Sequence, residues 1–297
     1  MRKSWKLGAV SVALMAALGL FGCSGGDTTE QKADKPAAPQ AETQAPEETK
    51  PEGEAVELQI FAANSLTKAM AEAEELYTQQ NPNVTFADTQ YEASGTLNEM
   101  LGAGQYADIL ITASKGTMDD AEAAELVDAD TREDMFVNDL VVIRAEGSDT
   151  RVEAIADVAN LDGKIAIGDA KIVPAGKYAN QALASVGLYT GTEGDDGEYA
   201  PDLADKVALA DKVGTAASYV STGDCVAGFV YSSDIFRYDG VEEAFVCPED
   251  SHKTIVYPGA VAESSRHADE AKAFIDFCLT NKKAQKIWAK YGFELSA

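Results

Sequence analysis

Short apolar runs alternate with helical patterns along residues 55–297. The runs predict strands at 56–62, 84–92, 109–112, 140–144, 165–168, 207–209 and 227–231. Helical periodicity follows at 66–79, from 97 onward, at 178–186 and at 215–220, and two amphipathic helices are predicted at 268–279 and 283–291. This alternation is typical of an α/β protein with mainly parallel sheets, and the segment is long enough for two lobes.

The first 23 residues have the pattern of an export signal. Arg2, Lys3 and Lys6 precede an apolar run, residues 7–21, that is too short to span a bilayer comfortably. The run ends in the sequence LFGC, which resembles the lipobox of bacterial lipoproteins. We therefore expect Cys23 to become an acylated N-terminus that anchors the protein to the outer face of a membrane. The alternative is a plain secretory signal with an incidental cysteine.

Residues 24–54 predict a disordered tether between this anchor and the folded part. The segment is rich in Gly, Pro, Ala, Thr, Gln and Glu, and its apolar residues show no periodicity. Such a composition cannot bury enough apolar surface to offset the entropy of folding. The predicted organisation is a signal peptide at 1–23, a tether at 24–54 and two lobes beyond it.

Charge and cysteine usage exclude several classes of function. The formal net charge is −26, so nucleic acid is not an expected partner. Cys225, Cys247 and Cys278 follow Cys23 without CxxC spacing; Cys225 and Cys247 are either a disulfide pair or separate core residues. Neither histidine belongs to a GxSxG or HExxH pattern. We therefore expect neither a metal centre nor an enzyme.

Five junctions that follow strands carry candidate hydrogen-bond donors. In the stretch IAIGDAKIVPAGKYA, residues 165–179, a strand leads through Pro174 to a helix start at which Ala175 has a free amide. Ser65 and Ser94 stand at two further junctions, Val213 opens another helix, and Tyr231 ends a strand. Each one alone is compatible with an ordinary helix start. Ligands gather at the carboxyl ends of parallel strands, however, so the convergence of five donors predicts an anion site.

Several motifs resemble the periplasmic molybdate-binding component of molybdate ABC transporters. They are FAANSL, SGTL, ADILITAS, IGDAKIVPAGKYA, GFVYSSD, PEDSHKTIVYP and KIWAKYGF, and the resemblance covers residues 56–295. It implies the two-lobed periplasmic-binding-protein fold of type II, with a mainly parallel, helix-flanked sheet in each lobe and the ligand in the cleft between them. The implied lobes are 55–139 plus 254–297 and 140–253, with crossovers near 138–141 and 251–257.

The resemblance also implies a site and a ligand. In that family neutral donors hold a tetrahedral oxyanion, and the matching positions are the side chains of Ser65, Ser94 and Tyr231 and the backbone amides of Ala175 and Val213. Asn64 stands where the family often has alanine, and Gly95 where it often has serine. The protein is thus expected to be a monomer that binds molybdate and tungstate, needs no cofactor and delivers the ion to an ABC permease.

Other readings remain open from the sequence. A protein of the same fold could bind sulfate or an amino acid, although an amino-acid site needs an arginine and an acid that the five junctions lack. An extracellular enzyme or a surface adhesin is the remaining alternative. Neutral donors offer no acceptor to the proton of hydrogen phosphate, so we expect that ion to be disfavoured.

Overall fold

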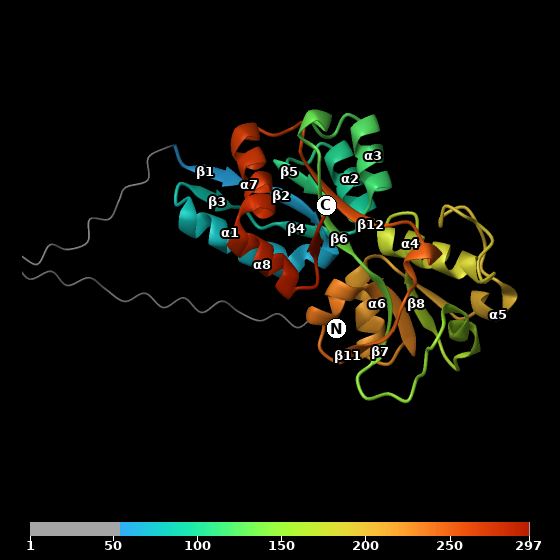
Figure 1. Ribbon diagram of the computed structural model, residues 1–297. Coiled ribbons are helices and arrows are strands. Elements are labelled where there is room, and N and C mark those ends of the chain that lie inside the picture. The colour runs from blue at the N-terminus through green and yellow to red at the C-terminus, as the bar shows by residue number, and fades with distance from the viewer. Residues whose placement is uncertain (1–53, 297) are drawn as a thin grey trace, which may run out of the picture. The chain divides into compact units, whose positions relative to one another are not determined.

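The computed structural model describes residues 54–296 (Figure 1). The predicted signal peptide, Cys23 and all of the predicted tether except Glu54 lie outside the described residues. The described strands form two large sheets and one small sheet, which confirms the α/β prediction. None of the helices between residues 54 and 296 is both long and apolar enough to cross a membrane.

The first lobe is built on a six-stranded sheet with the order β13-β6-β12-β5-β2-β4. Its strands are β2 (Ile60–Ala63), β4 (Gln90–Glu92), β5 (Ile109–Ile111), β6 (Glu133–Asn138), β12 (Ile255–Val261) and β13 (Glu294–Leu295). A two-stranded sheet, β1 (Val56–Leu58) with β3 (Val84–Phe86), belongs to the same part of the chain. The helices are α1 (Thr67–Gln80), α2 (Ser94–Gly102), α3 (Lys115–Ala123), α7 (Ala268–Thr280) and α8 (Lys282–Lys290).

Side chains alternate across this sheet and create two apolar layers. Ile60, Ala62 and Ile109 contribute to the large core on the side of α1, α7 and α8, while Phe61 and Leu110 pack with α2 and α3 (Figure 1). Successive residues of a strand point to opposite faces, so one short apolar run can serve both layers. The sheet is therefore buried on both sides, as its continuous apolar strands predict.

The second lobe is built on a five-stranded sheet with the order β11-β7-β10-β8-β9. Its strands are β7 (Leu140–Ala145), β8 (Ile165–Gly168), β9 (Val207–Ala210), β10 (Ala227–Tyr231) and β11 (Val241–Val246), and its helices are α4 (Pro174–Ser185), α5 (Pro201–Ala204) and α6 (Val213–Ser221). Short 3₁₀ turns complete the two lobes: η1 (Asn64–Leu66), η2 (Ala129–Thr131), η3 (Ile155–Asn160), η4 (Ser232–Phe236) and η5 (Glu249–Ser251).

Both sheets combine parallel and antiparallel pairing, so each is a mixed sheet and not the mainly parallel sheet that was predicted. Strand β2 is parallel to β4 and β5, and β8 is parallel to β9 and β10. Strands β6, β7, β11, β12 and β13 pair only in antiparallel fashion. The parallel strands are those whose carboxyl ends carry the predicted donors, so the pairing brings these ends to one edge of each sheet.

The chain passes between the sheets at two places. Strand β6 leads directly through Asp139 into β7, and β11 leads through residues 247–254 into β12. The carboxamide of Asn138 connects the first of these crossings to η4. Its Nδ2 donates to Ser233 Oγ at 2.8 Å, and its Oδ1 accepts from Ser232 Oγ at 2.7 Å. The predicted residue limits of the two lobes stay a prediction.

Two predicted strands are each divided in the structure. The amide of Gln59 donates to Asp108 Oδ2 at 2.8 Å, and this bond separates β1 from β2. Residues 87–89 separate β3 from β4 in the same way. The three cysteines after Cys23 are buried and unpaired, so Cys225 and Cys247 are core residues and not a disulfide. No group of potential metal ligands is found among residues 54–296.

Candidate functional site

A small cavity lies between the two lobes where the parallel strands end. Its lining comes from the ends of β2, β4 and β10 and from the starts of α2, α4 and α6: Ala63, Asn64, Ser65, Glu92, Ala93, Ser94, Ala113, Val173, Pro174, Val213 and Tyr231. The centre of a water-sized sphere can move through about 10 Å³ of it. That is roughly the space that a single water needs, so the two lobes lie close together around this cavity.

The structure brings four of the five predicted donors to this lining. Ser65 and Ser94 approach it from the first lobe, and Val213 and Tyr231 approach it from the second. Ala175 is the exception, because it lies one residue beyond the lining residues Val173 and Pro174. Ala175 is nevertheless buried, with 1% of its surface exposed.

Two backbone amides at helix starts remain free in the second lobe. The amide of Gly176 donates to Val173 O at 2.9 Å, but no acceptor lies within hydrogen-bond reach of the Ala175 amide among residues 54–296. The Val213 amide opens α6 and likewise lacks an acceptor in the described chain. The positive end of a helix dipole lies behind each group, so both are donors suited to an anion.

The two serine hydroxyls are arranged as donors on the opposite side. Ser94 Oγ accepts the amide of Ala113 at 3.0 Å, which leaves the serine proton uncommitted. Ser65 Oγ lies 2.9 Å from the hydroxyl of Tyr257, and that hydroxyl accepts from Asn138 Nδ2 at 3.2 Å. Because Tyr257 can then donate to Ser65, the Ser65 proton is also available.

Tyr231 contributes a buried hydroxyl with no protein partner. Its side chain is 1% exposed, and its oxygen forms no geometrically acceptable hydrogen bond with any described residue. The rings of Tyr257 and Tyr178 pack edge-on at 5.6 Å and 6.5 Å. Burial raises the pKa of Tyr231 well above its usual range, so the group stays a neutral donor. An unpaired buried hydroxyl costs about 1–3 kcal/mol, and such exceptions call for an explanation.

The charges around the cavity neutralise one another in pairs. Lys212 Nζ and Glu92 Oε2 meet at 2.8 Å across the lobes, and hydrogen bonding to Glu92 raises the pKa of Lys212. Arg237 Nη1 and Asp234 Oδ1 meet at 2.6 Å in the interior, where burial raises the pKa of Asp234 despite the ion pair. Lys212 and Glu92 are 120 residues apart, so no local pattern links them, whereas Arg237 follows Asp234 by three residues. The cavity therefore offers an anion neutral donors and helix dipoles, not a free cation.

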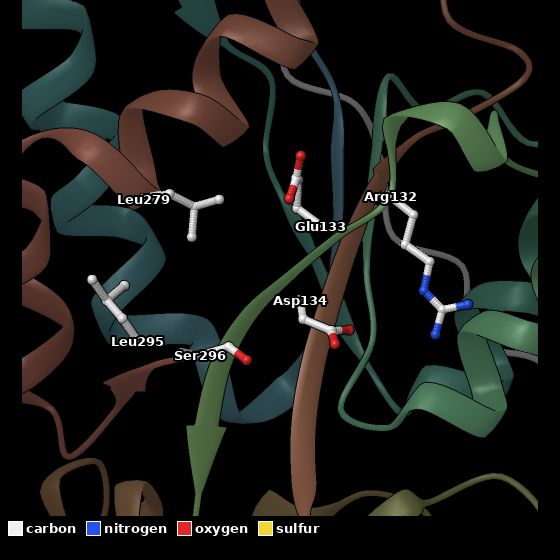
Figure 2. A pocket seen from close by; sticks show the side chains of 6 residues that line it. All are labelled: Arg132, Glu133, Asp134, Leu279, Leu295 and Ser296. Atoms are coloured by element: carbon white, nitrogen blue, oxygen red, sulfur yellow. The ribbon is translucent and has the colours of Figure 1, made fainter.

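A larger hollow of about 550 Å³ lies elsewhere, beside β6 and β13. Figure 2 shows Leu279 and Leu295 on one side of this hollow and Arg132 on the other. Its strongest charges are already engaged, since Arg132 contacts Asp119 and Glu122 at 2.7 Å and Asp134 contacts Lys115 at 2.5 Å. None of the five predicted donors lies in its lining, so its size does not make it the ligand site.

Two lobes joined by two passages, with donors from both lobes around one cavity, define a solute-binding protein. The chain belongs to the family described as bacterial extracellular solute-binding protein, whose sequence profile matches residues 58–294. Members of this family bind and hand over solutes and are not enzymes, in agreement with the expectation from the sequence.

The chain is similar in sequence to named solute-binding proteins. The chain is 34% identical over 242 residues to the molybdate-binding protein ModA of Escherichia coli, covering 80% of this chain and 88% of that protein. It is 30% identical over 242 residues to the putative ABC transporter substrate-binding lipoprotein YvgL of Bacillus subtilis, covering 80% and 86%. Among solved structures, the substrate-binding domain of a putative molybdenum ABC transporter from Clostridium difficile is similar, with 34% identity, a TM-score of 0.61 and coverage of 82% and 100%.

Proposed function

We propose that this protein is an extracytoplasmic receptor that binds molybdate in the cavity between its lobes. The proposed donors are the hydroxyls of Ser65, Ser94 and Tyr231 and the amides of Ala175 and Val213. The observation that carries the proposal is the Tyr231 hydroxyl, which is buried and unpaired at a cavity lined by other donors. A tetrahedral oxyanion would give each of these donors an acceptor.

The donor set is strong enough for a tight complex. A hydrogen bond to a charged group contributes roughly 1.5–3 kcal/mol, and a helix end adds about 0.3–1 kcal/mol. Five such contacts cover the roughly 8–12 kcal/mol of a micromolar-to-nanomolar complex, even after the cost of ordering the ligand. No compensating cation is needed, which fits the acidic composition of the chain.

Selectivity follows from the same chemistry. Neutral donors provide no acceptor for the proton of hydrogen phosphate, so that ion leaves a buried O–H unpaired. Sulfate is fully deprotonated but smaller than molybdate, so its exclusion would have to come from the size of the closed cavity. Tungstate matches molybdate in shape and charge, and we propose that the site binds both.

We further propose that the bound form is delivered to an ABC permease. The donors are divided between the lobes, so the ligand stabilises the closed arrangement and presents the permease with a defined surface. The protein would act as a monomer held at the membrane by acyl chains on Cys23. Replacement of Cys23 by alanine is expected to release it into the soluble fraction, and retention on membranes would contradict the anchor.

A thermal-shift series followed by calorimetry tests the ligand. Molybdate and tungstate are expected to raise the melting temperature strongly, since a ligand at one hundred times its Kd stabilises by about 2.7 kcal/mol. Phosphate is the control that shares the tetrahedral shape but carries a proton. A response to sulfate alone would replace molybdate by sulfate as the ligand. No response to any oxyanion would end the proposal.

A further inference from the structure

We propose that Asn64 and Arg237 form a latch that joins the two lobes beside the cavity, which Asn64 itself lines. In this latch Asn64 is a positioning residue, because it holds the start of α6 against the first lobe. The inference rests on the proposed function for its choice of ligand, but the contacts themselves involve only protein groups. Together these contacts make up the Asn64–Arg237 latch.

The side chain of Asn64 bridges the lobes with all of its acceptor capacity. Its Oδ1 accepts from the Gly214 amide at 3.2 Å and from Arg237 Nη2 at 3.2 Å, both in the second lobe. Its Nδ2 donates to Tyr91 O at 3.2 Å within the first lobe. A carboxamide oxygen has two lone pairs, so the two contacts from the second lobe saturate it.

Arg237 is fixed in the second lobe and reaches into the first. Its side chain is 6% exposed and is anchored by the ion pair with Asp234, whose side chain is 1% exposed. The second branch of the guanidinium extends to Asn64 and also to Thr67 Oγ1 at 3.2 Å. A planar fork with several donors is suited to such a divided role, and a lysine is not.

The latch is continuous with the proposed donors. Asn64 immediately precedes Ser65, and Gly214 immediately follows Val213. Asp234 Oδ2 accepts the amide of Tyr231 at 3.1 Å. A change in the latch would therefore displace donors from both lobes, while a ligand that holds the lobes together would stabilise the latch. The two events are thermodynamically coupled.

The backbone at Gly214 shows how closely the lobes meet. A Cβ atom added there would lie 2.7 Å from Asn64 Oδ1 and 2.1 Å from the Tyr238 hydroxyl. Any other residue at this position would push the carboxamide away. The contact between the lobes therefore depends on the absence of a side chain at Gly214.

An independent contact between the lobes can report on the latch. The amide of Gly95 in the first lobe donates to Ile172 O in the second at 3.0 Å. Neither Asn64 nor Arg237 contacts this pair. The rate of hydrogen exchange at the Gly95 amide therefore measures opening of the lobes. Exchange at the Gly214 amide is a less direct measure, because a change at Asn64 also removes the acceptor of that amide.

The test compares Asn64→Ala with Asn81→Ala in the full chain, with and without sodium molybdate. Asn81 is the matched control, because its Nδ2 donates to Tyr77 O at 3.1 Å within the first lobe. We expect Asn64→Ala to accelerate exchange at Gly95 by about ten- to a hundredfold, the effect of losing a hydrogen bond to a charged group. Asn81→Ala should leave the Gly95 rate unchanged.

Arg237→Lys gives a second test that keeps a positive charge beside Asp234. It should accelerate exchange at Gly95 as well, because a single ammonium group cannot replace the fork. Circular dichroism confirms that each variant is folded. Acceleration at Gly214 alone, or a Gly95 amide that is unprotected in the wild type with and without molybdate, would overturn the latch.

The two proposals fail in different ways. If molybdate leaves all wild-type exchange rates unchanged while Asn64→Ala still accelerates Gly95 in the ligand-free protein, the ligand assignment fails and the latch stands. If molybdate slows exchange at Gly95 equally in the wild type and in Asn64→Ala, with no difference between them in the free protein, the latch fails and the ligand assignment stands.

Discussion

Removal of the Tyr231 hydroxyl should weaken the ligand without weakening the fold. Tyr231→Phe keeps the buried ring and its edge-on contacts with Tyr257 and Tyr178. It deletes an oxygen that has no protein partner in the described chain. The free protein then no longer buries an unpaired polar group, while the complex loses one donor to the anion.

These two effects have opposite signs and similar magnitudes. The lost hydrogen bond to a charged group costs roughly 1.5–3 kcal/mol of binding, which is about ten- to a hundredfold in Kd. The free energy of unfolding of the ligand-free protein should stay the same or rise by up to about 1–3 kcal/mol, which is the cost of burying an unpaired hydroxyl. Its melting temperature should therefore not fall. Ordinary damage to a core would instead lower stability.

Calorimetry with molybdate and thermal unfolding of the ligand-free protein measure the two effects separately. Tyr189→Phe is the matched control, because the Tyr189 hydroxyl accepts the Gly197 amide at 2.7 Å and belongs to the same lobe but not to the cavity. This control should lose some stability and retain its affinity. An unchanged Kd for a folded Tyr231→Phe would remove Tyr231 from the site and refute the reasoning from its unpaired oxygen.

Three further predictions concern the fit of the lobes, pH and the cysteines. Gly95→Ala should weaken molybdate by at least about tenfold in calorimetry, because the new Cβ would lie 2.8 Å from Ile172 Cα, whereas Gly102→Ala in the same helix meets nothing and should be silent. Burial raises the pKa of Glu74 to about 7. Its neutral form is therefore favoured by folding, and the free energy of unfolding should fall as pH rises from about 4.5 to 7. Denaturant titrations of Glu74→Gln should lose this pH dependence, and an identical slope in the variant would contradict it. Replacement of all three buried cysteines by alanine should lower stability through cavities yet leave the molybdate Kd unchanged, and a folded variant with weakened binding would show the contrary.

The sequence predicted those features that depend on neighbours along the chain. Apolar runs located the strands that end at the cavity, and proline and serine located the helix starts beside them. The predicted donors Ser65, Ser94, Val213 and Tyr231 line the cavity, and each could be proposed because it stands at such a junction. Ala175 lies one residue outside the lining, since residue limits at a helix start depend on the course of the loop before it.

Contacts between distant segments could not be predicted in this way. Asn64 and Arg237 are 173 residues apart, and Lys212 and Glu92 are 120 residues apart, so no local pattern links either pair. Strand β12 contains Pro258 and Gly259, which interrupt a strand pattern, and β13 has only two residues. Their positions are decided by pairing with β6, which is a tertiary contact.

The pairing of Lys212 with Glu92 and of Arg237 with Asp234 beside the cavity has a consequence for the surroundings in which the protein can work. A site that attracts an anion with exposed lysines becomes weaker as the ionic strength of the medium increases. Here the attraction comes from short contacts with uncharged groups, while Arg237 and Asp234 are withdrawn from solvent. Dissolved salt does not weaken these short contacts, while it screens the repulsion between the anion and a chain whose net charge is −26. Burial raises the pKa of Tyr231 well above its usual range, so its hydroxyl stays a neutral donor. Capture of the ion should therefore not become weaker from fresh to saline water, which suits a receptor that meets an environment the cell does not control.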